Sequence, residues 1–133
     1  MEQGKTILIV DDSEPVVMLL KEFLRIKGFT VLPALSGIKA LNILQHSSPD
    51  LVLLDLMMPE MDGFEVLSSI RKNKETSQLK VFMLTACSEP EFRQKAMDLG
   101  ADGYLTKPVN LSELSKVLES VKEPVTGQVA AFE

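Results

Sequence analysis

Five short apolar segments alternate with five longer segments of helical periodicity, and this alternation constrains the fold more than any other feature of the chain. The apolar segments are residues 6–10, 29–32, 51–54, 81–84 and 103–105. Each has the length of a strand and is rich in aliphatic or β-branched side chains. Strands separated by helices form parallel sheets, because each helix carries the chain back to the end where the next strand begins. The sequence therefore predicts an α/β fold built on a parallel sheet.

Strand composition also predicts where each strand lies in the sheet. Segments 6–10, 51–54 and 81–84 are continuously apolar, as strands covered by helices on both faces are. Segment 29–32 is followed by Pro33, and segment 103–105 is short. Proline and shortness both suit an edge strand, so we expect these two segments at the edges of the sheet.

Three helical segments show which face they bury. In the first, Val17, Leu20 and Leu24 lie on one face, and Gly28 is expected to end the helix. The last begins with a capping sequence at 110–113, and its predicted apolar stripe consists of Leu111, Leu114, Leu118 and Val121. The fourth is the least apolar, and its predicted exposed residues are Arg93, Gln94, Lys95 and Asp98.

Size and charge limit the possible functions. The 133 residues suit one domain, which we place at 1–122, followed at 123–133 by a tail or the start of a linker. A net charge of −5 gives no basic surface for direct binding of nucleic acid. The single cysteine, Cys87, cannot form an internal disulfide, and no apolar run approaches the ~20 residues of a membrane span. We therefore expect a cytoplasmic protein without a membrane partner.

Chemically active side chains follow four of the five predicted strands. Asp11 and Asp12 follow the first, Asp55 the third, Thr85 the fourth, and Lys107 comes shortly after the fifth. In open parallel α/β sheets, ligands bind beyond the carboxyl ends of the strands, where the strand order reverses. These five residues therefore form the candidate site.

Three carboxylates in one place require a cation or a proton. Two unit charges ~4 Å apart repel by about 4 kcal/mol at an effective dielectric constant near 20. Mg²⁺ is the natural partner, because it takes one or two protein carboxylates together with phosphate oxygens. A free carboxylate beside the metal can act as a nucleophile toward phosphorus, with Lys107 and Thr85 sharing the charge of the phosphoryl oxygens.

Each of these residues also has an ordinary structural interpretation. Asp12 alone is as well explained as the cap of the following helix. Thr85 is a common strand residue, and most lysines, Lys107 included, would be solvated at the surface. Asp62, three residues before Glu65, is better explained as a helix cap than as part of the site.

Four motifs in a fixed order resemble those of one known family. They are DD at 11–12, LLDLMMPEMDG at 53–63, LTA at 84–86 and YLTKP at 104–108. Together they resemble the response regulator receiver domain of two-component signal transduction, the CheY-like family, over about residues 5–122. The resemblance implies a flavodoxin-like, doubly wound sheet of five parallel strands in the order 2-1-3-4-5, with five helices.

The resemblance also implies a role for each site residue. Asp55 would be the phosphoacceptor, and the donor would be a sensor histidine kinase, a phosphotransfer protein or a small molecule. Asp12 and Asp55 would bind Mg²⁺ through their side chains, Met57 through its backbone carbonyl and Asp11 through water. Lys107 would contact the phosphoryl group, and its bond to the following proline is expected to be cis.

Two further residues would convert phosphorylation into a change of shape. Thr85 would move toward the phosphoryl group and Tyr104 would rotate inward behind it, although Tyr104 is equally well explained as an edge-strand aromatic. The changed face, made by the fourth helix, fifth strand and fifth helix, would bind a downstream protein or an output domain. The product is a conformation, so we expect no enzymatic activity beyond phosphorylation of the chain itself and slow autodephosphorylation.

Met57 and Cys87 occupy the positions that flank the phosphoryl group in this family. Neither side chain is an acid or an amide that could orient an attacking water. We therefore predict that the aspartyl phosphate hydrolyses more slowly than in relatives with polar residues there.

Three other functions compete with a phosphorylation switch. A phosphatase of the haloacid dehalogenase type also pairs Mg²⁺ with a strand-end aspartate, but it usually has D-x-D and a cap insertion, whereas Asp11 and Asp12 are adjacent. A nucleotide-binding module would need a glycine-rich loop after the first strand, which the sequence lacks. A docking module without phosphorylation would not need the complete set of acidic residues, Thr85 and Lys107.

Overall fold

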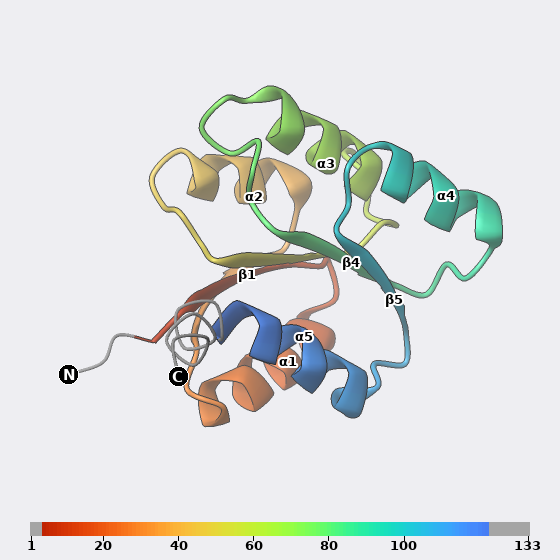
Figure 1. Cartoon of the computed structure of the whole chain (residues 1–133). Coiled ribbons are helices and arrows are strands. Elements are labelled where there is room, and N and C mark those ends of the chain that lie inside the picture. The colour runs from red at the N-terminus through yellow and green to blue at the C-terminus, as the bar shows by residue number, and fades with distance from the viewer. Residues whose placement is uncertain (1–3, 123–133) are drawn as a thin grey trace, which may run out of the picture.

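Five parallel strands form one sheet in the order β2-β1-β3-β4-β5 in the computed structural model, which describes residues 4–122 (Figure 1). The strands are β1 Thr6–Val10, β2 Thr30–Ala34, β3 Leu51–Leu54, β4 Val81–Thr85 and β5 Gly103–Thr106. This topology confirms the predicted fold class, and β2 and β5 lie at the edges as expected. The tail or linker expected at 123–133 lies outside the described residues.

Strand β2 is displaced from its predicted range. It begins at Thr30 and continues through Pro33 to Ala34, instead of ending before the proline. Pro33 pairs with Ile9 in the register of β1, and its side chain is exposed. An edge strand tolerates proline because a missing N–H does no harm on the side that has no neighbour.

The helices form two layers, one on each face of the sheet. Their bounds are α1 Glu14–Ile26, α2 Gly37–Leu44, α3 Gly63–Lys72, α4 Pro90–Asp98 and α5 Leu111–Lys122. Helices α1 and α5 cover one face, and α2, α3 and α4 cover the other (Figure 1). Because successive side chains of a strand point to opposite faces, both faces of each central strand must be apolar.

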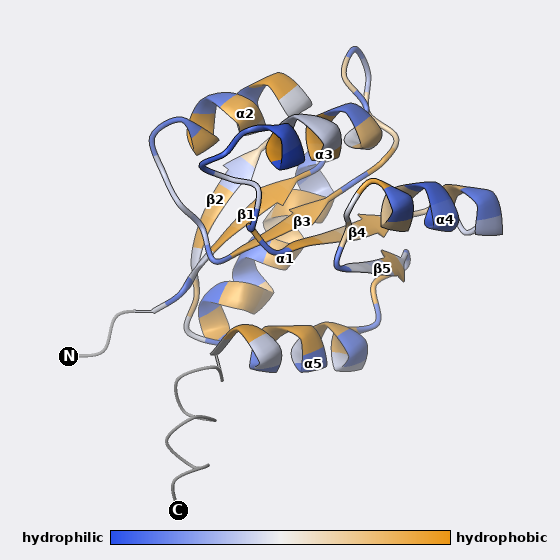
Figure 2. Cartoon of the chain, turned by 45° about the horizontal axis from the view of Figure 1, so that its top comes forward, coloured by the Kyte–Doolittle hydropathy of each residue, from blue (hydrophilic) through white to orange (hydrophobic). Residues whose placement is uncertain are grey.

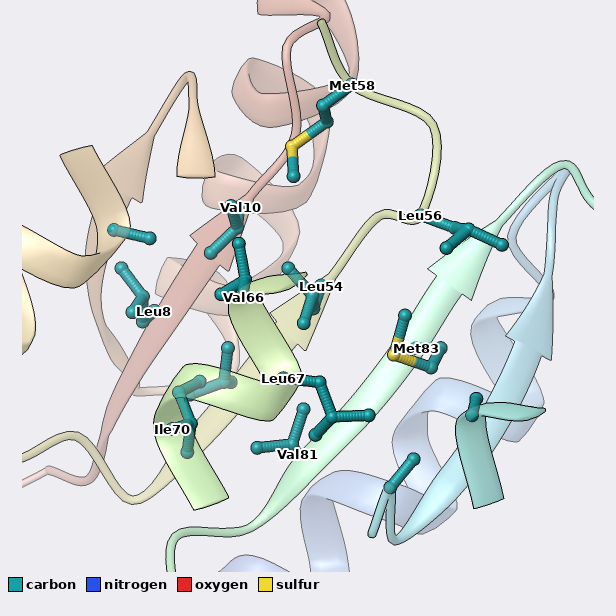
Figure 3. Close-up of a cluster of buried hydrophobic side chains, with 14 of the residues drawn as sticks. Leu8, Val10, Leu54, Leu56, Met58, Val66, Leu67, Ile70, Val81 and Met83 are labelled. Atoms are coloured by element: carbon teal, nitrogen blue, oxygen red, sulfur yellow. The ribbon is translucent and has the colours of Figure 1, made fainter. Parts of the chain in front are cut away.

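Two apolar cores result, one on each side of the sheet. Leu8 and Val10 of β1 belong to the core that includes Val66 and Leu67 of α3 (Figure 3). Ile7 and Ile9 of the same strand belong to the core under α1 and α5. The uninterrupted apolar sequence of β1 is thus explained by burial on both faces.

The helix predictions are confirmed with one exception. Val17, Leu20 and Leu24 of α1 are buried, and the helix ends before Gly28, whose φ of 98° favours glycine. In α4 only Ala96 is buried, and Figure 2 shows this helix as mostly hydrophilic. The exception is Leu111, the first residue of α5, which is 45% exposed and is not part of the core under α1 and α5.

One arginine joins two loops at the amino end of the sheet, where the strands begin. Arg71 of α3 donates hydrogen bonds to backbone carbonyls of both loops: Ser77 (3.1 Å), Leu79 (2.6 Å) and Gly100 (2.9 Å). It also pairs with the Asp102 carboxylate at 3.1 Å. The described part of the chain contains no helix long and apolar enough to cross a membrane.

Candidate functional site

The sheet brings the predicted site residues together at its carboxyl end, where the strands finish. Asp11 directly follows β1, Asp55 directly follows β3, and Thr85 is the last residue of β4. Lys107 directly follows β5. Strands β1 and β3 are neighbours at the point where the strand order reverses, so their two carboxylates meet at the position expected for a ligand site.

The acidic cluster consists of Asp11, Asp12 and Asp55. Each offers a carboxylate oxygen, and these three oxygens lie within 4.8 Å of one another. Asp11 and Asp55 are only 3% and 6% exposed, whereas Asp12 is exposed. The cluster therefore has two carboxylates fixed in the protein and a third that is open to solvent.

Backbone N–H groups orient the two buried carboxylates. Oδ1 of Asp11 accepts a hydrogen bond from the Ser13 N–H at 2.9 Å, and Oδ1 of Asp55 accepts one from the Leu56 N–H at 2.7 Å. The cap of α1 is Ser13, whose hydroxyl accepts from the Val16 N–H at 3.4 Å. The interpretation of Asp12 as a helix cap is therefore wrong.

Lys107 holds the two buried carboxylates together. Its Nζ lies 2.6 Å from Oδ2 of Asp11 and 3.3 Å from Oδ2 of Asp55. Burial acts to lower the pKa of the Lys107 ammonium, but the hydrogen bond to Asp11 and the charges of both carboxylates outweigh it, so this pKa is raised. Lys107 is thus a charged member of the site and not a solvated surface lysine. Its peptide bond to Pro108 is cis, as expected.

The donor set of the acidic cluster fits a hard divalent cation. Three carboxylates face one ammonium, so the cluster keeps an excess of negative charge that Lys107 alone does not balance. Mg²⁺ and Ca²⁺ are bound in proteins by oxygen ligands of this kind. The cluster can therefore hold a metal ion.

Thr85 and Tyr104 are connected through the peptide groups of Cys87. The Thr85 side chain is fully buried, and its hydroxyl accepts a hydrogen bond from the Cys87 N–H at 3.3 Å. The Tyr104 hydroxyl donates to the Cys87 carbonyl at 2.7 Å. Burial raises the pKa of Tyr104 above its usual value, with a further contribution from nearby Cys87. Tyr104 is therefore not an edge aromatic with its hydroxyl in water.

The remaining predicted residues come from the loops that follow β3 and β4. Met57 is 61% exposed, and Cys87 is a half-buried free cysteine. Asp62 is not part of the cluster. It caps α3, with its carboxylate accepting from the Glu65 N–H and the Glu65 carboxylate accepting from the Asp62 N–H, both at 2.9 Å.

Sequence reasoning missed three contributors to the site. Ser13 had a usable signal, because a serine shortly before a proline suits a helix start. The Leu56 N–H is a backbone group and leaves no trace in the sequence. Arg93, whose guanidinium carbon lies 5.9 Å from the centre of the Tyr104 ring, comes from another element, and no spacing rule connects the two.

Comparison with known proteins gives a consistent result. The family model for the response regulator receiver domain matches residues 7–119. The chain is 40% identical over 119 residues to the probable transcriptional regulator ycf27 of Porphyridium aerugineum, covering 90% of this chain and 48% of that protein. It is 45% identical over 108 residues to the transcriptional regulatory protein CpxR of Escherichia coli K12, covering 81% of this chain and 45% of CpxR.

Solved structures agree with these sequence matches. The chemotaxis protein CheY4 of Vibrio cholerae superimposes with a TM-score of 0.83 at 33% sequence identity, covering 89% of this chain and 98% of that one. By contrast, this chain spans about half the length of the curated relatives named above.

Proposed function

Because this chain belongs to the response regulator receiver domain family, whose members are phosphorylation-dependent signalling switches, we propose that it is switched by phosphorylation of Asp55. The observation that carries this proposal is the acidic cluster with Lys107 at the carboxyl end of the sheet. Asp55 is fixed by the Leu56 N–H and lies beside both the Lys107 ammonium and the two other carboxylates. A nucleophile that is held in this way is ready to react without reorganisation.

Phosphoryl transfer from a phosphohistidine is the proposed reaction. An Asp55 carboxylate oxygen forms a bond to phosphorus, the phosphorus–nitrogen bond breaks, and the imidazole leaves with a proton from solvent. Asp12, Asp55, the Met57 carbonyl and, through water, Asp11 would hold Mg²⁺, which when bound supplies positive charge to the phosphoryl oxygens. Lys107, which now contacts both buried carboxylates, would contact a phosphoryl oxygen instead.

The signal would leave the site through Thr85. Its hydroxyl now accepts from the Cys87 N–H, and a shift toward the phosphoryl group would weaken that hydrogen bond. The Cys87 carbonyl holds the Tyr104 hydroxyl, so the same shift would bias the position of the Tyr104 ring. We propose that the α4-β5-α5 face differs between the two states and binds the downstream protein or output domain.

Partners follow from the same chemistry. The donor would be a sensor histidine kinase or a phosphotransfer protein. Because the curated relatives are named as transcriptional regulators, a transcriptional output domain is the favoured downstream partner. The chain itself carries a net charge of −5 and would not contact nucleic acid directly. Its own chemistry would be limited to phosphorylation and slow dephosphorylation of Asp55.

A phosphate mimic tests the proposal. The full chain is incubated with Mg²⁺ and either acetyl phosphate or beryllofluoride, and the mass increase or the ¹⁹F NMR signal of bound beryllofluoride is measured. We expect a Mg²⁺-dependent response in the wild type and none in Asp55→Asn. Asp62→Asn is the matched control: Asp62 is a nearby carboxylate used only as a helix cap, and asparagine also caps well, so it should respond normally.

Three outcomes would contradict the proposal. The first is a wild type that does not respond, which would favour a docking module that is not phosphorylated. The second is an equal response in Asp55→Asn. The third is repeated turnover of p-nitrophenyl phosphate, which would indicate a phosphatase.

A further inference from the structure

The Tyr104 ring is held from two sides. Inside, its hydroxyl donates to the Cys87 carbonyl at 2.7 Å. Outside, the guanidinium of Arg93 lies 5.9 Å from the ring centre, within the range of a cation–π interaction. Arg93 is an exposed residue of α4, and Tyr104 is only 8% exposed on β5. The ring is therefore buried in part because a surface side chain covers it.

A continuous series of contacts leads from the site to this surface. The Thr85 hydroxyl contacts the Cys87 N–H, and the Cys87 carbonyl contacts the Tyr104 hydroxyl. The Tyr104 ring then contacts Arg93. An outward rotation of Tyr104 would break its bond to Cys87 and its contact with Arg93 together, because both depend on one ring position.

We propose that Arg93 is a positioning residue that latches Tyr104 in its buried rotamer. This proposal rests on the proposed function, because it assigns a regulator to the same switch. The ratio of buried to outward Tyr104 is then set from outside by α4 as well as from inside by the phosphoryl site. A cation–π contact at an exposed position changes such a ratio by roughly two- to five-fold.

Lys95 provides a matched control on the same helix. Its ammonium lies 4.5 Å from the centre of the Phe64 ring, and Phe64 stacks on Phe92 with ring centres 6.3 Å apart. Lys95 thus makes the same kind of contact from α4, but to α3 and not to Tyr104. Removing its charge tests whether any cation–π contact of α4 has the same effect.

Tyr104 fluorescence measures the latch directly. The chain contains one tyrosine and no tryptophan, so tyrosine emission reports on Tyr104 alone. The experiment compares acrylamide quenching of the full chain in wild type, Arg93→Gln, Arg93→Lys and Lys95→Gln, without phosphate mimic. We expect stronger quenching in Arg93→Gln, partial recovery in Arg93→Lys because an ammonium also binds a ring face, and wild-type quenching in Lys95→Gln.

Two results would overturn the latch. One is equal quenching of Arg93→Gln and the wild type, and the other is an equal increase in Lys95→Gln. Bound beryllofluoride, measured by ¹⁹F NMR in the same samples, separates this proposal from the proposed function. If the wild type does not bind it, phosphorylation fails as the function, while the quenching comparison still decides whether Arg93 positions Tyr104.

Discussion

At the amino end of the sheet, Asp50 accepts a hydrogen bond from the Thr6 N–H and Asp102 accepts one from the Val81 N–H, each at 2.8 Å. At the carboxyl end, Asp11 and Asp55 share the single ammonium of Lys107. The same residue type thus completes the strand ladder at one end and forms a reactive cluster at the other.

The direction of the strands explains the difference. Parallel strands expose N–H groups where they begin, and these donors stabilise carboxylates. Where the strands finish they expose carbonyl oxygens, which are acceptors and cannot stabilise a carboxylate. Within residues 4–122, the partners of the carboxylates at that end are Lys107, a few local N–H groups and each other, so these carboxylates keep the excess charge that suits a cation. Stability is therefore expected to depend on the amino end and function on the carboxyl end.

The largest expected effect comes from removing Arg71. Arg71→Ala deletes four hydrogen bonds at the amino end and leaves the carbonyls of two loops without their donor. We expect the free energy of unfolding to fall by about 3 kcal/mol, measured by urea denaturation. Lys72→Ala, at the exposed neighbouring position, is the control and should change it little. A loss below about 1 kcal/mol in Arg71→Ala would show that the loops are held by other contacts.

A pair of isosteric changes compares the two ends directly. Asp102→Asn weakens the bonds to the Val81 N–H and to Arg71, so we expect a loss of about 1 kcal/mol, kept small because Asp102 is exposed. Asp55→Asn removes one of three mutually repelling carboxylates while Asp11 still binds Lys107, so the free energy of unfolding should stay unchanged or rise by up to about 1 kcal/mol.

Urea denaturation in metal-free buffer measures both members of this pair. Equal losses at the two ends would contradict the division of roles between them. A rise in the free energy of unfolding of Asp55→Asn, together with loss of beryllofluoride binding, would be the strongest support for this division.

The smallest expected effect concerns the lifetime of the phosphorylated state. Met57, two residues after Asp55, is exposed, and its thioether cannot orient an attacking water. Met57→Asn should therefore accelerate dephosphorylation by roughly three-fold, equivalent to about 0.7 kcal/mol in the barrier. Loss of the phosphorylated mass after removal of acetyl phosphate gives the rate. A rate that is unchanged or slower in the variant would reject a role for this position in water access.

Local signals predicted much of the fold and of the site. The apolar runs predicted five strands, and Gly28 predicted the end of α1 because few other residues adopt its φ of 98°. Asp62 and Glu65 predicted the capping box of α3, since a capping box is a contact between residues three apart.

Contacts between distant residues could not be predicted in this way. Leu111 fits the helical stripe of α5 but extends beyond the core, and only the placement of the helix on the sheet shows this. Lys107 was expected to contact a phosphoryl group. In the structure its closest carboxylate is that of Asp11, 96 residues away in sequence, and no local pattern indicates this contact.

The sequence by itself determined which residues stand at the ends of which strands, because periodicity and chain direction are local properties. It thereby determined that three carboxylates, Thr85 and Lys107 gather at one end of the sheet. Only the tertiary structure decided how they are held: Lys107 between two carboxylates, Thr85 and Tyr104 on either side of the Cys87 peptide groups, and Arg93 over the Tyr104 ring. These contacts join different elements, and their geometry depends on how helices and strands pack, which no spacing in the chain encodes.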